Sequence, residues 1–113
     1  MIEARDLDPL EAVALKASEV HHAPFEDFAS LQFERPVILH IDNDIMNLQD
    51  APANNYPVPG GPRLNEVTEA CRRFVRNNSV CAISFSGWNS RLYVDGTTAR
   101  SCRSLLSAIS EAL

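Results

Sequence analysis

Hydrophobic residues recur every three or four positions in three segments of the chain, a spacing that predicts amphipathic helices. The first helix is expected from Pro9 to about Ser18, with Asp8 as its N-terminal cap. The second is expected from about Leu64 to Arg76, ending at Asn77–Asn78, and Thr98 is the predicted cap of the third. The positions expected to face the core are Leu10, Val13, Ala14 and Ala17 in the first helix, Leu64, Val67, Cys71, Phe74 and Val75 in the second, and Cys102, Leu105, Leu106, Ile109 and Leu113 in the third.

Two continuous apolar runs predict buried strands. They are Pro36–Ile41, which is rich in β-branched residues, and Ser79–Phe85, which follows the second helix. Because both runs are apolar nearly throughout, we expect both strands to be covered on both faces, as in a parallel sheet. The alternation of helices and strands indicates an α/β fold, a parallel sheet with flanking helices that binds ligands at the carboxyl ends of its strands.

The remaining segments are shorter or less regular. Met1–Glu3 is a candidate strand stub, Glu19–Ala23 a candidate short strand and Pro24–Ser30 a helical turn. Ile45–Pro62 is rich in proline, glycine and asparagine, which predicts a stiff, shaped loop, and loops of this length in compact domains are usually functional. Ser86–Gly96 reads as a polar loop.

The length, composition and net charge of the chain favour some kinds of protein and ligand over others. A chain of 113 residues with 45% hydrophobic residues is expected to be one globular domain, and it contains no apolar run of the roughly 20 residues that cross a membrane. The net charge of −5 disfavours nucleic acid and anionic membranes and suits metal ions or a guanidinium-bearing substrate, although solubility alone also explains it. We expect a cytoplasmic protein in which Cys71, Cys81 and Cys102 are buried, reduced thiols.

Two carboxylates follow the first predicted strand. Asp42 and Asp44 stand two positions apart and therefore point the same way, about 6–7 Å apart along the strand, with His40 at the start of the same row. Two like charges at this distance are costly unless a cation lies between them, and oxygen ligands beside an imidazole suit Mn, Mg, Fe or Zn ions. A pair of loop-capping aspartates is the alternative.

The surrounding residues resemble a known signature. Read without a gap, His40–Gly61 is similar to the ureohydrolase pattern of an S-[FIL]-D-x-D strand end, a D-P-x-x-A-P segment and a P-x-P-G-G turn before a helix. Glu3–Glu11 is similar to the arginase segment G-x-R-D-x-D-P-x-E, and Thr98-Ala99 to the pair that opens the last helix of the family. The positions in register in the first stretch are Asp42, Asp44, Ala51, Pro52, Pro57, Pro59, Gly60 and Gly61. The chain thus resembles the C-terminal part of the arginase–agmatinase–formimidoylglutamase family.

The resemblance implies a site. It implies that residues 1–113 form a single partial arginase-like domain with the C-terminal part of that family's three-layer fold. In the family two manganese ions activate a hydroxide that attacks a guanidinium-type carbon, and the match makes Asp42 and Asp44 metal ligands. The match also makes Asp8 and Glu11 substrate-binding residues, for which helix capping and a favourable first-turn charge are the alternatives.

Departures from the family pattern weigh against catalysis. The other metal ligands, an early histidine and a D-x-H-x-D strand, belong to a part of the fold that this chain lacks, and Gly87 stands where the substrate glutamate is expected. We therefore assign no catalytic residue and expect at most weak, partial manganese binding. His40 is either an extra ligand or a hydrogen-bonded strand residue, and Trp88 either fills a substrate pocket or an interface or packs at the surface.

Two functions remain open. One is a truncated ureohydrolase-like domain that is inactive alone; the other is the metal-binding half of a split di-manganese amidinohydrolase. Under both, uncovered strand edges and apolar faces predict a homo-oligomer or a complementing N-terminal half as partner, with a guanidino small molecule as a further ligand.

Overall fold

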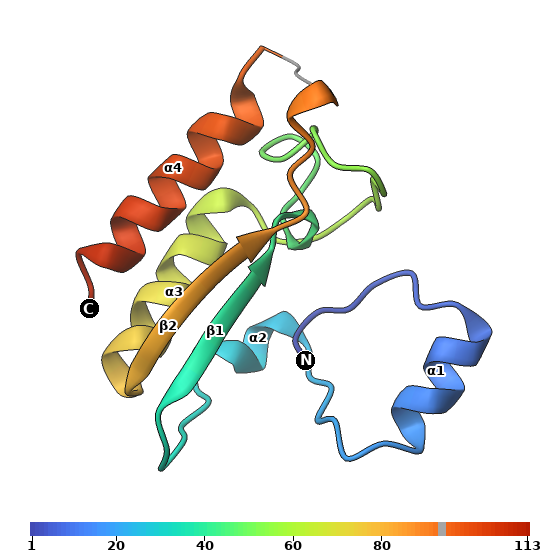
Figure 1. The fold of residues 1–113 in the computed structure, drawn as a ribbon, viewed down its shortest axis with the longest axis vertical. Helices are drawn as coiled ribbons and strands as arrows, with labels where there is room; N and C mark the ends of the chain where they lie inside the picture. Colours follow the sequence, from blue (N-terminus) through green and yellow to red (C-terminus); the bar gives the residue numbers. More distant parts are fainter. Residues whose placement is uncertain (93–94) are drawn as a thin grey trace.

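Two parallel strands and two long helices form the centre of the molecule (Figure 1). The structure is a computed structural model that describes residues 1–92 and 95–113. Strand β1 (Val37–Asp42) pairs in parallel with β2 (Val80–Ser86), so that His40 lies opposite Ser84 and Asp42 opposite Ser86. Both strands and the helix between them were predicted within a residue or two, and the α/β class with a parallel sheet and flanking helices is confirmed.

One face of the sheet is covered by helices. Helix α3 (Leu64–Asn77) and helix α4 (Thr97–Ser110) pack against each other, and both contribute to the hydrophobic core with Leu39 and Ile41 of β1. The short helix α2 (Phe25–Phe28) adds Phe28, whose ring stacks on Phe74 with 4.7 Å between the ring centroids. The core therefore lies between the sheet and these helices.

The other face of the sheet is exposed. Along β1 only Leu39 and Ile41 are buried, whereas Ile38 is 68% exposed and His40 and Asp42 are also exposed. The expectation that both faces are covered is wrong for residues 1–92 and 95–113, because no element in these ranges packs over Ile38. An apolar strand with one open face results.

The N-terminal region is the least packed. Helix α1 (Pro9–Lys16) forms as predicted, yet it buries none of its residues, and Leu10 and Val13, two of the expected core positions, are exposed. The candidate strand Glu19–Ala23 is wrong, because this segment contributes only an isolated bridge between Ala23 and Ile2.

Helix α4 differs from its prediction in its cap and its face. Gly96, at φ 77°, precedes the helix, and the Thr98 hydroxyl does not cap it but accepts the N–H of Ala53 at 2.9 Å. Leu106 and Leu113 are exposed rather than in the core. The side chains that α4 buries are Thr98, Ser101, Cys102, Leu105, Ala108 and Ile109. The buried face of α4 is therefore displaced from the predicted one, and its first turn holds a loop through the hydrogen bond between Ala53 and Thr98.

That loop is the proline-rich segment 45–62. It begins in the 3-10 helix η1 (Asn43–Ile45) and adds no further regular element before α3, as expected. Met46 and Ala51 are nevertheless completely buried, so the segment forms part of the core. A second 3-10 helix, η2 (Ser90–Leu92), lies in the predicted polar loop after β2.

The three cysteines are free thiols, but they are not equivalent. Cys71 and Cys102 are buried as predicted, and burial raises the pKa of Cys71 to about 12. Cys81 is exposed on β2, so the prediction of a buried thiol is wrong there. Among the helices that the structure describes, none is long and apolar enough to cross a membrane.

Candidate functional site

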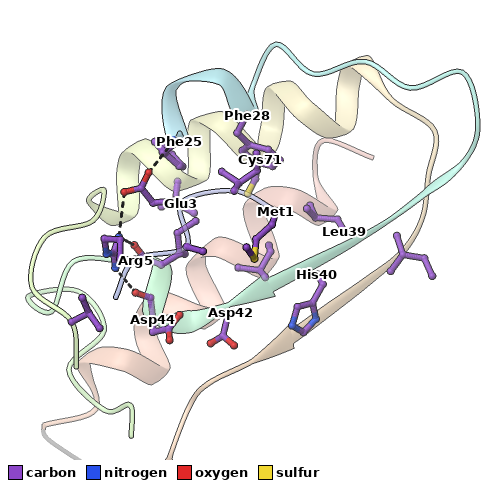
Figure 2. A pocket seen from close by; sticks show the side chains of 17 residues that line it. Met1, Glu3, Arg5, Phe25, Phe28, Leu39, His40, Asp42, Asp44 and Cys71 are labelled. Atoms are coloured by element: carbon purple, nitrogen blue, oxygen red, sulfur yellow. Dashed lines mark hydrogen bonds and ion pairs between the residues drawn. The ribbon is translucent and has the colours of Figure 1, made fainter. Parts of the chain in front are cut away.

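Asp42 and Asp44 line one cavity at the carboxyl end of β1 (Figure 2). Asp42 is the last residue of the strand, and Asp44 lies in η1, one turn further. Partial burial raises the pKa of Asp44 above its ordinary value, and the charge and hydrogen bonding of the neighbouring Asp42 raise it further. The pair thus concentrates negative charge at the end of the cavity.

Arg5 anchors the N-terminal segment to this pair. Its guanidinium donates to the backbone carbonyl of Asp44 at 2.6 Å and to that of Ile45 at 3.0 Å, and it forms an ion pair with Glu3 at 3.7 Å. The positive charge lowers the pKa of Asp44, an effect smaller than those of burial and Asp42. Arg5 was not among the predicted site residues, although it is the arginine of the R-D-x-D match.

A row of polar side chains crosses the open face of the sheet. His40 Nδ1 lies 2.6 Å from Ser84 Oγ, and His40 Nε2 lies 3.2 Å from Ser86 Oγ. The Ser86 hydroxyl donates to Asp42 Oδ2 at 3.0 Å. Both ring nitrogens of His40 therefore have protein partners, which favours the hydrogen-bonded strand residue over the extra metal ligand.

Gly87 leaves room for the carboxylate of Asp42 because it has no side chain. The residue adopts φ +79°, and a Cβ atom there would lie 1.9 Å from Asp42 Oδ1 and 3.1 Å from the backbone nitrogen of Asn43. The carboxylate of Asp42 thus occupies the space that a side chain at position 87 would need. A glutamate at this position, where the ureohydrolase resemblance expects one, is sterically incompatible with this arrangement.

Asp8 and Glu11 lie at the start of α1, outside the cavity that Asp42 and Asp44 line. Asp8 Oδ1 accepts the backbone N–H groups of Leu10 and Glu11 at 2.7 and 2.9 Å, and Glu11 Oε2 accepts the N–H of Asp8 at 3.1 Å. This reciprocal capping box fixes the first turn of α1, and neither side chain lines the cavity of Asp42 and Asp44. Their geometry is that of the capping alternative. Trp88 is about half exposed.

The donor set limits the metal that the site fits. Within residues 1–92 and 95–113 no group of three or more histidine, cysteine, aspartate or glutamate side chains is placed to hold an ion. Asp42 and Asp44 supply carboxylate oxygens, the ligand type that Mn²⁺ and Mg²⁺ accept, but they leave most coordination positions to water. These residues fit one weakly held ion and do not fit a two-metal centre.

Comparison with known proteins confirms the resemblance at the level of the fold. A scan against protein-family models and a search of curated proteins give no match. Among solved structures, the chain is similar to the arginase of Bacillus subtilis, with a TM-score of 0.80 and 22% identity over 96% of this chain and 43% of that one. Formimidoylglutamase from Bacillus subtilis subsp. subtilis str. 168 gives a TM-score of 0.78 at 18% identity, over 98% of this chain and 39% of that one.

An arginase with lower sequence identity shows the same similarity of fold. Entamoeba histolytica arginase, solved in complex with L-ornithine, gives a TM-score of 0.77 at 14% identity, over 96% of this chain and 41% of that one. The 113 residues therefore span about two fifths of the length of these proteins, in their C-terminal part. At these identities the likeness concerns architecture: the chain has the fold of the C-terminal part of arginase-like ureohydrolases.

Proposed function

We propose that this chain is a non-catalytic ureohydrolase-like domain, related to the manganese-dependent hydrolases of guanidino substrates and inactive on its own. The observation that carries the proposal is that the carboxylate of Asp42 occupies the space beside Gly87 where a side chain would begin. The position where the family resemblance expects a substrate-binding glutamate has no side chain, and the carboxylate of Asp42 fills the space. A guanidinium would therefore lack its expected partner.

The site retains a capacity for weak cation binding. Asp42 and Asp44 are the residues that would hold a divalent ion such as Mn²⁺, and such an ion would offset their mutual repulsion. With only two carboxylates, the dissociation constant is expected near or above the ~10⁻³ M of the weakest calcium modules. Activation of water between two ions requires both to be held, and the described donors do not support that.

A partner is part of the proposal. Ile38 on the open face of β1 and Leu10 and Val13 of α1 are large apolar side chains that are mostly exposed to solvent. A homo-oligomer or a complementing chain would cover them.

The second candidate is the metal-binding half of a split di-manganese amidinohydrolase. The observation that favours it is the intact carboxylate pair at the end of a cavity. In that case a partner chain supplies the missing ligands, and activity appears only when the two chains are mixed.

The test is a turnover assay of the purified chain with excess Mn²⁺ and arginine, agmatine or formimidoylglutamate. We expect no product above the level of the Asp42→Ala, Asp44→Ala double variant. We also expect a small Mn²⁺-dependent stabilisation, about 0.4 kcal/mol when the ion concentration equals its dissociation constant, that the double variant lacks. Product release that depends on the two aspartates would overturn the non-catalytic assignment.

A further inference from the structure

The end of β1 and the first residue of η1 are held by contacts from β2 and α4. The hydroxyl of Ser86 donates to Asp42 Oδ2 at 3.0 Å. Asn43 is completely buried, and the thiol of Cys102 donates to its side-chain oxygen Oδ1 at 3.1 Å. Asp42 and Asn43 therefore have side-chain partners in the central elements of the fold.

The rest of η1 is held by an arginine from the N-terminal segment (Figure 2). Arg5 Nη2 donates to the backbone carbonyl of Asp44 at 2.6 Å, and Arg5 Nη1 donates to that of Ile45 at 3.0 Å. The same guanidinium lies 3.7 Å from Glu3 Oε1, while Glu3 Oε2 accepts the backbone N–H of Phe25 at 3.0 Å. A continuous path of contacts therefore runs from the first residue of α2 through Glu3 and Arg5 to the backbone of Asp44.

The turn before α3 leaves space for this arginine. Gly61 adopts φ +79°, and a Cβ atom there would collide with Arg5 Nη1 and with the backbone oxygen of Ile45. At the preceding residue, Gly60, a Cβ atom would meet nothing within 4 Å, although the φ angle of +90° is similar. The hydrogen bond between Arg5 and Ile45 therefore occupies the space that a side chain at position 61 would need.

The guanidinium of Arg5 is directed to the backbone of Asp44 and Ile45 and to the carboxylate of Glu3. Its N–H donors lie in a fixed plane, so it can serve several acceptors at once, which the compact ammonium of a lysine does less well. Ligand groups that are held in place before binding cost less free energy to order. A site with only two carboxylates depends strongly on this economy, because it has few contacts with which to offset the cost.

We propose that Arg5 is a positioning residue for divalent-cation binding by Asp42 and Asp44, and that it acts by holding the backbone of Asp44. The inference rests on the proposed capacity for weak cation binding and is independent of whether the chain is catalytic. It predicts the opposite sign from a purely electrostatic role. A positive charge beside two carboxylates repels a cation, so its removal alone would strengthen cation binding. Loss of a positioning contact weakens binding instead.

The test is a titration of the purified chain with Mg²⁺ at constant ionic strength, followed by the amide chemical shifts of residues 42–45. We expect saturable shifts in the native chain that Asp44→Asn removes. Arg5→Gln should weaken Mg²⁺ binding by about tenfold, the lower end of the loss when a group that supports a metal ligand is removed. Arg5→Lys, which keeps the charge, should weaken it nearly as much. Arg73→Gln removes the charge of an arginine that pairs with Glu69 on α3, and it should leave Mg²⁺ binding unchanged.

A second pair of variants disturbs the same contact without changing any charge. Gly61→Ala places a Cβ atom against Arg5 and Ile45 and should weaken Mg²⁺ binding, whereas Gly60→Ala, which meets no neighbour, should not. Unchanged amide shifts in β2, α3 and α4 show that each variant is folded. A loss of affinity in a folded variant then reports the position of Asp44 rather than general destabilisation.

Four outcomes would overturn the proposal. They are the absence of a saturable Mg²⁺ shift that depends on Asp44, equal or tighter binding by Arg5→Gln, native affinity in Arg5→Lys, and equal effects of the two alanine variants. The non-catalytic assignment is tested separately, because it fails only if product release depends on the two aspartates, whatever the affinity for Mg²⁺.

Discussion

Replacement of Gly87 by alanine tests whether the position of Asp42 depends on a missing side chain. The new Cβ would lie 1.9 Å from Asp42 Oδ1, far inside van der Waals contact, and the residue would have to keep φ +79°. Asp42 can yield only by rotating its carboxylate away from Ser86, whose hydroxyl donates to it at 3.0 Å. The substitution therefore combines backbone strain with displacement of the carboxylate.

The expected loss of stability has two parts. A non-glycine residue in the left-handed region costs about 1–2 kcal/mol. Loss of the hydrogen bond from Ser86 adds about 1 kcal/mol, and a displaced rotamer of Asp42 adds about 0.5–1 kcal/mol. We expect Gly87→Ala to lower the free energy of unfolding by about 3 kcal/mol.

Gly60→Ala is the matched control. Gly60 also has a positive φ, +90°, but a Cβ there would meet no atom within 4 Å. Urea denaturation followed by circular dichroism should show Gly87→Ala to be more destabilising than Gly60→Ala by about 1–2 kcal/mol. In an Asp42→Ala background this excess should vanish, since the atom in conflict is gone. Equal effects of the two glycine substitutions, or an excess that persists without Asp42, would refute the reasoning.

Three further predictions concern groups outside this contact. The Arg63 guanidinium lowers the pKa of Asp50, and the Asp50 carboxylate also accepts the first N–H of α3. The contribution of ionised Asp50 to stability is therefore present above pH 3.8 and is lost as the pH falls through the lowered pKa. Asp50→Asn should cost about 1 kcal/mol at pH 7 and flatten the acid limb of the stability curve in urea titrations. Cys81 should be the one thiol that reacts with a disulfide reagent in the native protein, with the two buried thiols reacting only after unfolding. Asp8→Ala should accelerate hydrogen exchange in α1 without moving the global unfolding midpoint, because α1 buries no residue.

Local patterns in the sequence were sufficient for the elements that position the carboxylates. The β-branched run before Asp42 predicted β1, and the apolar spacing from Leu64 predicted α3, because each pattern matches the period of its element. The end of a parallel strand is where ligands bind in α/β folds, so the place of Asp42 followed from these elements. The metal-ligand assignment of Asp42 and Asp44 stays a prediction.

Contacts between distant segments could not be predicted in the same way. Thr98 has the residue type of a helix cap, but its hydroxyl is used by Ala53, which is 45 positions away. Arg5 binds the carbonyl of Asp44, 39 positions away. Such contacts depend on how the loop 45–62 packs, and no periodic pattern in the sequence encodes that packing.

The apolar sequence of β1 is typical of a strand that is more deeply buried than β1 is among the described residues. In a strand with one wet face, hydrophobic and polar residues alternate, whereas Val37-Ile38-Leu39 is apolar without interruption. Ile38 is 68% exposed, and burial of an isoleucine side chain stabilises a protein by about 1.5–3 kcal/mol. Within residues 1–92 and 95–113 no strand pairs with the other edge of β1, which leaves backbone groups that sheets normally protect. A partner that covers both this edge and Ile38, as proposed above, would relieve both deficits.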